Sequence, residues 1–249
     1  MKLPNLNPAS RMANGALFDK EGKPKPGIQR TIERAIEVQR PLVLANLRRM
    51  YAKNPQATAA EISADLERHY LAVITVTGAA VGATAVVPAV GTIASLGLSA
   101  AATVGFLEAT ALYAQSIAEL HGVQTGDPER ARTLVMAILM GEEGLALIQS
   151  VLRGSGSGAS EHWGTVLGGS VSSPIARTIG HSIRRRFVRK MLAKQGGALL
   201  GRALPFGIGA VVGGAGNHMM GRAVITATAQ AFGPAPSVVP GELLKDLDS

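Results

Sequence analysis

The feature that most constrains this chain is a run of 37 residues, Leu71 to Leu107, that contains no Asp, Glu, Lys or Arg. Pro88 stands near its middle, and a proline inside a helical pattern ends or kinks the helix because it has no backbone N–H and its ring clashes with the preceding turn. The run therefore predicts two helices joined at VVPAVG. The apolar tip of this hairpin consists of Val86, Val87, Pro88 and Val90.

The composition of this run decides between a membrane and a protein core. Its length would allow two short crossings, since each needs about 20 apolar residues. Ten of the 37 residues are Ala, five are Gly and five are Thr, and these types gain little or lose on transfer to lipid. The turn also has no polar residue for the far side of a bilayer. Shallow insertion into one leaflet, burial in a soluble helical core and true spanning therefore remain open as alternatives.

The rest of the chain also has helical periodicity and no strand alternation, so the predicted fold class is all-α. Thr58 and Glu61 are spaced as a capping box, in which hydroxyl and carboxylate satisfy free backbone amides at a helix start. Gly122 is a candidate C-terminal cap, and Asp127 followed by proline is a typical helix start. The architecture predicted from these signals is a multi-helix bundle around two Gly/Ala-rich apolar hairpins.

The predicted organisation has three parts. Residues 1–27 are expected to be a disordered N-terminal arm, residues 28–232 a helical domain, and residues 233–249 a C-terminal tail ending in a short turn, with a flexible linker at 154–160 inside the domain. Pro41 is expected to break the first helical segment, and Gly141 to Gly144 to interrupt a later one. The second hairpin is predicted at ALPFGIGAVVGG.

The charge distribution predicts a partner. The net charge is +8, and the 80 residues between Glu161 and Glu242 contain nine Lys or Arg and no acid. Within them, a predicted helix over residues 174–195 carries an apolar stripe and a basic face, a pattern typical of membrane-surface helices or of core-packed helices with a solvated basic face. The residues predicted to contact anionic lipid are Arg184, Arg185, Arg186, Arg189, Lys190 and Lys194.

Few residues suggest catalysis. The chain has no cysteine, its five histidines are scattered, and no phosphate-binding loop is present. We therefore expect no enzyme activity, no metal and no cofactor. Nucleic acid is not an expected partner, because aromatic residues for base stacking are scarce. The helix over 92–120 is expected to regain polarity at Glu108, Gln115 and Glu119. Glu108 is interpreted as the water boundary of that helix, rather than as a buried functional carboxylate, and Asn217 as the donor of an interhelical hydrogen bond.

Two blocks of the chain, LEATALYAQSIAELHGVQTGDPERARTLVMAILMG and ALPFGIGAVVGGAGNHMMGRAVITATAQAF, resemble the EcsC family. The residues that match its motifs are Glu108, Gly122, Pro205, Gly209, Gly213, Gly214 and Asn217, with Gly209 displaced by one position and Glu108 standing where Asp is usual. The family is bacterial, poorly characterised and named for an ABC-transporter operon. The resemblance implies no catalytic residues, but it favours membrane association and a link to a transport or secretion system.

Together these observations predict a non-enzymatic helical protein, cytoplasmic and peripheral at the inner face of the membrane. Its predicted partner is an anionic lipid surface or a membrane protein. The alternative is a soluble helical module that binds a lipid or another hydrophobic ligand between its glycine-rich hairpins.

Overall fold

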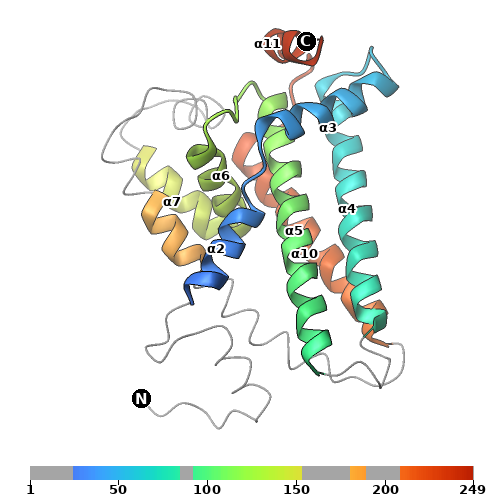
Figure 1. Ribbon diagram of the computed structural model, residues 1–249. Helices are drawn as coiled ribbons and strands as arrows, with labels where there is room; N and C mark the ends of the chain where they lie inside the picture. The colour runs from blue at the N-terminus through green and yellow to red at the C-terminus, as the bar shows by residue number, and fades with distance from the viewer. Residues whose placement is uncertain (1–24, 85–91, 153–179, 189–207, 249) are drawn as a thin grey trace.

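The computed structural model describes residues 25–84, 92–152, 180–188 and 208–248 (Figure 1), and every regular element in these ranges is a helix. The all-α prediction is confirmed for this part of the chain. The helices are α2 (Pro26–Ala35), α3 (Arg40–Lys53), α4 (Ala59–Thr84), α5 (Thr92–Leu120), α6 (Pro128–Met140), α7 (Glu142–Leu152), α10 (Ile208–Phe232) and α11 (Gly241–Asp248), and residues 180–188 are also helical.

Two predicted helix starts are confirmed by their hydrogen bonds. At the start of α4, the Thr58 N–H donates to Glu61 Oε2 at 2.8 Å and the Glu61 N–H donates to Thr58 Oγ1 at 3.2 Å. This is the reciprocal capping box, which satisfies two amides that a helix start leaves free. At the start of α6, Asp127 Oδ1 accepts from the Glu129 and Arg130 N–H groups at 3.0 and 3.2 Å.

Two predicted helix ends are confirmed as well. Gly122 has φ of 74°, a left-handed conformation that glycine adopts without a Cβ clash. Its N–H donates to Glu119 O and the Val123 N–H donates to Ala118 O, both at 2.9 Å, which is the Schellman closure of α5. Gly141, with φ of 65°, separates α6 from α7. The predicted break near Pro41 lies just before it, between the end of α2 and the start of α3.

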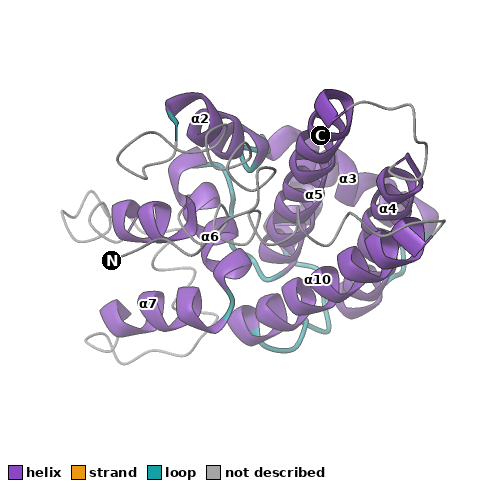
Figure 2. Cartoon of the chain, turned by 90° about the horizontal axis from the view of Figure 1, so that it is seen from below, coloured by secondary structure: helices purple, strands orange, loops and turns teal. Residues whose placement is uncertain are grey.

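Three long helices, α4, α5 and α10, lie side by side and form the main bundle (Figures 1 and 2). The most extensive contact joins α4 to α10, and the next joins α4 to α5. On the other side of α5 lie α2, α6, α7 and the helix over 180–188, while α3 and α11 lie together at the upper end in Figure 1. One continuous hydrophobic core joins these groups, with Leu107, Leu134 and Ile138 among its fully buried members.

The two helices predicted for the first hairpin, α4 and α5, do contact each other. What the sequence did not predict is that α4 packs most extensively against α10, which follows it by more than 120 residues. The predicted tip residues Val86, Val87, Pro88 and Val90 lie outside the described residues, as does Pro205. The segment after Pro205 belongs to a single helix from Ile208 to Phe232.

The predicted tail also differs, because residues 241–248 form the helix α11. Leu243 and Leu247 of α11 are buried, and they are four residues apart, so they share one face. Arg48 of α3 donates to the Leu247 carbonyl at 2.7 Å and to the Asp246 carbonyl at 3.0 Å. These bonds satisfy carbonyls that the end of a helix leaves free, so α3 holds α11 in place.

Candidate functional site

Three segments without Asp, Glu, Lys or Arg lie at one end of the bundle, residues 71–84 of α4, 92–107 of α5 and 208–221 of α10. We call them the uncharged end. This end is the lower one in Figure 1, opposite α3 and α11. The chain therefore gathers the uncharged segments of three helices in one place, although one of them is distant in sequence.

Side-chain contacts fix the level at which this uncharged end begins. Tyr70 of α4 stacks on Tyr113 of α5 with ring centroids 4.7 Å apart, and its hydroxyl lies 2.7 Å from Thr110 Oγ1. On the other side of α4, a Cβ added to Gly221 of α10 would meet Ile74 Cδ1 and lie 2.9 Å from Leu71 Cδ2. The turn of α4 from Tyr70 to Ile74 is therefore level with residues 110–113 of α5 and with Gly221 of α10.

One exposed charged residue on each helix follows the uncharged end, namely Arg68 on α4, Glu108 on α5 and Arg222 on α10. The exposure of Glu108 agrees with its interpretation as a water boundary. Beyond these residues α4 carries further charges, whereas α5 has none before Glu119 and α10 has none up to its end at Phe232.

The interface between α4 and α10 is built from small residues and polar pairs. A Cβ on Gly214 would lie 3.3 Å from Ala79 Cβ, so the two backbones approach closely. Asn217 Nδ2 donates to the Ile74 carbonyl at 3.0 Å, which confirms the predicted interhelical hydrogen bond. His218 Nδ1 lies 3.3 Å from Thr75 Oγ1. Gly209 and Gly213, the other two α10 glycines of the EcsC-like motif, also lie in this helix.

The uncharged end also exposes large apolar side chains. Val73 and Val76 of α4 are 41% and 67% exposed, and Met219 and Met220 of α10 are 72% and 47% exposed. Two other large apolar side chains among the described residues are exposed, Leu42 of α3 at 61% and Val238 before α11 at 71%. These two lie at the opposite end of the molecule, so they provide natural controls.

Within the described ranges, no helix has both the length and the hydropathy needed to cross a bilayer.

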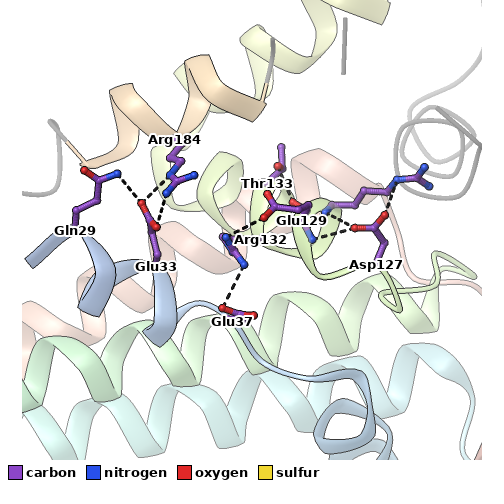
Figure 3. Close-up of polar contacts among 9 residues, drawn as sticks. Gln29, Glu33, Glu37, Asp127, Glu129, Arg132, Thr133 and Arg184 are labelled. Atoms are coloured by element: carbon purple, nitrogen blue, oxygen red, sulfur yellow. Dashed lines mark hydrogen bonds and ion pairs between the residues drawn. The ribbon is translucent and has the colours of Figure 1, made fainter. Parts of the chain in front are cut away.

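The basic face predicted over 174–195 is described only for residues 180–188. The apolar stripe predicted there is buried at Ile183 and Phe187. Arg184, however, forms an ion pair with another helix of the same chain. Its Nε and Nη2 donate to the two carboxylate oxygens of Glu33 in α2 at 2.7 and 2.5 Å (Figure 3). The Glu33 side chain is only 11% exposed, so this ion pair is an internal contact between the two helices.

Two of the three nitrogens of the Arg184 guanidinium are thus engaged inside the protein, and the side chain is 34% exposed, so its lipid contact stays a prediction. Gln29 completes the cluster by donating to Glu33 Oε1 at 2.8 Å. Arg186 approaches Glu143 at 3.7 Å, while Arg185 is exposed. The other three predicted cations, Arg189, Lys190 and Lys194, lie outside the described residues.

This difference between neighbouring arginines gives a direct prediction. Arg184→Gln should lower the free energy of unfolding by about 2 kcal/mol, since it leaves the Glu33 carboxylate buried without its charged partner. Arg185→Gln, the matched control in the same helical turn, should change it by less than about 0.5 kcal/mol. Urea unfolding followed by circular dichroism measures both, and equal effects of the two substitutions would contradict the assignment.

A second set of ion pairs joins α2 to α6 (Figure 3). Arg132 of α6 contacts Glu37 after α2 and Glu129 in its own helix, both at 3.2 Å. The Arg132 side chain is 12% exposed. The ion pairs of Arg132 and Arg184 thus connect α2 and the residues just after it to α6 and to the helix over residues 180–188.

The most buried ionic cluster was missed by the sequence prediction, which expected polarity to return at Gln115 and Glu119. Both side chains are buried. Arg40 Nε donates to Glu119 Oε1 at 2.8 Å, and Arg40 Nη2 donates to Glu119 Oε2 at 3.0 Å and to Asp246 Oδ2 at 2.7 Å. Glu119 Oε1 also accepts from the backbone and hydroxyl of Thr125 at 2.7 and 2.9 Å. The hydrogen bonds to Glu119 raise the pKa of Arg40 further above its ordinary value.

The stacked tyrosines make a prediction about alkaline pH. Burial raises the pKa of Tyr70 and of Tyr113, the latter also through the negative charge of Glu67. Above a pH of about 10 the unfolded chain releases phenol protons that the folded protein keeps. The stability that the two buried phenols contribute is therefore complete below that pH and is lost as the pH rises.

We therefore expect the free energy of unfolding to fall between pH 9 and 11, by up to about 1.4 kcal/mol per pH unit for each tyrosine. The Tyr113→Phe variant should have a shallower pH dependence, because phenylalanine has no proton to lose. Urea unfolding at several pH values is the measurement. This explanation would be contradicted if the wild-type free energy of unfolding did not change up to pH 11. It would also be contradicted if that of the variant fell as steeply with pH as that of the wild type.

Among the described residues, no three His, Cys, Asp or Glu side chains gather closely enough to hold a metal ion. The clusters of charged side chains described above join helices to one another, so their role is structural. The exposed apolar side chains of the uncharged end have no such role inside the protein. Comparison with known proteins found no matching family model, no similar curated protein and no similar solved structure at a significant level. Membership of the EcsC family therefore stays a prediction from the two sequence blocks.

Proposed function

We propose that this protein is a non-enzymatic, peripheral membrane protein that attaches to the inner face of an anionic membrane through its uncharged end. The observation that carries the proposal is the group of large apolar side chains that the uncharged end exposes, Val73, Val76, Met219 and Met220. Core packing explains why uncharged segments lie against one another, but it does not explain why large apolar side chains face outward. An apolar medium around this end would cover them.

The physical terms of attachment are burial of apolar surface and attraction of cations. Four large apolar side chains at this end are exposed in the free protein, and their transfer from water to lipid is favourable at about 25 cal/mol per Å² of buried apolar surface. Each Lys or Arg close to an anionic leaflet adds about 1 kcal/mol. The long stretch without acids supports such attraction, although the charge of Arg184 is largely balanced by its ion pair with Glu33.

Flotation with liposomes tests this proposal. The wild-type protein should float with vesicles of phosphatidylglycerol and phosphatidylcholine, and the Val76→Glu/Met219→Glu variant should remain in the dense fraction. The matched control, Leu42→Glu/Val238→Glu, adds the same two charges at exposed sites of the opposite end and should float like the wild type. Failure of the wild type to float, or equal loss in both variants, would reject the proposal.

The biological role is proposed on the sequence resemblance alone. The EcsC-like blocks favour an accessory role beside a membrane transport or secretion system, with a membrane protein as the second partner. Flotation would then be a first step, followed by crosslinking in intact membranes to find neighbours that depend on the uncharged end. A protein that floats but gains no membrane-protein neighbour would support lipid binding and reject this second partner.

A further inference from the structure

We infer that the uncharged end enters the bilayer end-on, with lipid surrounding both α4 and α10 and the Arg222 guanidinium at the level of the lipid phosphates. This inference rests on the proposed membrane attachment and adds its geometry, its depth and its headgroup contact. The residues involved are described residues of the uncharged end, together with Arg68, Glu108 and Arg222 next to it.

The directions of the exposed side chains favour a surrounding medium over a flat partner. On α4, Leu71 and Ile74 contact α10, and Val73 and Val76 each follow one of them by two residues. Residues two apart in an α-helix point about 200° apart, so Val73 faces away from α10. Thr75 and Ala79 also contact α10, so Val76 points to the side of this contact rather than directly away from it. Their exposed fractions, 41% for Val73 and 67% for Val76, agree with these directions.

The same relation holds on α10. Asn217 and Gly221 contact α4, and Met219 lies two residues from each. Met219 therefore faces away from α4 and is 72% exposed. Exposed apolar side chains thus lie on opposite sides of the α4–α10 pair. A second copy of the chain or a flat protein surface would cover one of these sides, whereas lipid acyl chains can cover both.

The charged residues at the boundary indicate the depth. Among the described residues, no carboxylate lies within ion-pair distance of Arg222, and its side chain is exposed. Arg68, at a similar height, is paired with Asp65. Glu108 limits the depth, because this exposed carboxylate can stay in the hydrated headgroup layer but not enter the hydrocarbon core. Among the described residues at this height, Arg222 is therefore the cation without a carboxylate partner that is available for a lipid phosphate, to which guanidinium groups bind well.

The helix rise then sets how far the end reaches. From Leu71 to the end of α4 at Thr84 the helix rises about 20 Å, at 1.5 Å per residue. The hydrocarbon core of a bilayer is about 30 Å thick, so one leaflet provides about half of that. The uncharged end is too short to cross and long enough to fill one leaflet and the inner part of its headgroup layer.

Single-cysteine labelling tests the geometry, and the natural chain has no cysteine to remove. An environment-sensitive fluorophore is placed at Val76→Cys, Met219→Cys, Leu42→Cys or Val238→Cys of the full chain. Vesicles contain phosphatidylglycerol and phosphatidylcholine, with or without a lipid that carries a spin-label quencher on its acyl chain. Labels at positions 76 and 219 should both shift to shorter emission wavelength and be quenched, whereas labels at 42 and 238 should do neither.

The outcomes separate this inference from the proposed function. Vesicle binding with only one of positions 76 and 219 quenched would overturn end-on insertion and leave membrane attachment in place. Shielding of either label without vesicles would indicate self-association and overturn lipid as the occupant. A wild-type protein that fails to bind vesicles would remove both proposals together.

Substitution at Arg222 tests the headgroup contact. Arg222→Gln should weaken binding to these anionic vesicles about fivefold, as expected for one cation near a charged leaflet. Arg222→Lys should retain most of the affinity, because the charge is kept. Circular dichroism of both variants checks that α10 stays folded. Wild-type affinity in the Arg222→Gln variant would overturn the assignment of this residue.

Discussion

Replacing Glu119 by alanine is expected to lower the free energy of unfolding by about 3 kcal/mol, because it leaves Arg40 with only the more exposed carboxylate of Asp246 and leaves Thr125 without its acceptor. Glu119 is 2% exposed and receives two hydrogen bonds from Arg40 and two from Thr125. Its removal therefore weakens three places at once, namely the start of α3, the end of α5 and the loop that leads to α6.

The matched control for this substitution lies on the same helix. Glu108→Ala removes an exposed carboxylate from α5 and should change the free energy of unfolding by less than about 0.5 kcal/mol. Urea unfolding monitored by circular dichroism measures both variants. Equal losses at positions 119 and 108 would mean that the Arg40 cluster does not stabilise the fold.

The second large effect is expected at Gly144 of α7. A Cβ at this position would overlap the Ala137 carbonyl oxygen and would lie 2.8 Å from both the carbonyl carbon and Cα of Ala137 in α6. The obstacle is backbone, so no side-chain rotation relieves it. Gly144→Ala should therefore force α7 away from α6 and lower the free energy of unfolding by about 3 kcal/mol.

A glycine in open space provides the control. Gly216 lies in α10, and a Cβ there would meet nothing within 4 Å. Because alanine favours helix over glycine, Gly216→Ala should raise stability by up to about 1 kcal/mol. Opposite signs for the two Gly→Ala changes are thus the expected result in thermal unfolding. A Gly144→Ala protein as stable as the wild type would show that α6 and α7 are not in close contact.

Local signals in the sequence predicted the helix boundaries well. A capping box needs only Thr58 and Glu61 three residues apart, and a Schellman closure needs only a glycine such as Gly122 after the last turn. These interactions lie within one or two turns of helix, so composition and spacing suffice to find them. The same holds for Asp127, whose side chain caps the helix that follows it directly.

Contacts between distant segments could not be predicted in this way. Arg40 meets Glu119 across 79 residues and Arg184 meets Glu33 across 151. A single sequence gives no measure of which arginine faces which acid, so Arg184 looked like its neighbour Arg185. The pairing of α4 with α10 could not be predicted for the same reason, because the uncharged helices have similar sequences and nothing in them indicates which two will pack together. Asn217 was the exception, since a lone amide in an apolar helix indicates a partner on another helix.

The pairing of α4 with α10 has a consequence for the order in which the chain is made. Between the end of α4 at Thr84 and the start of α10 at Ile208 lie more than 120 residues, which take about 6–25 s to synthesise at typical rates. Throughout that interval the helix that finally covers this face of α4, with Gly214 and Gly221, has not yet been made. A chaperone or a membrane surface that covers this face during synthesis would therefore act before the fold is complete, on a helix that has already emerged from the ribosome.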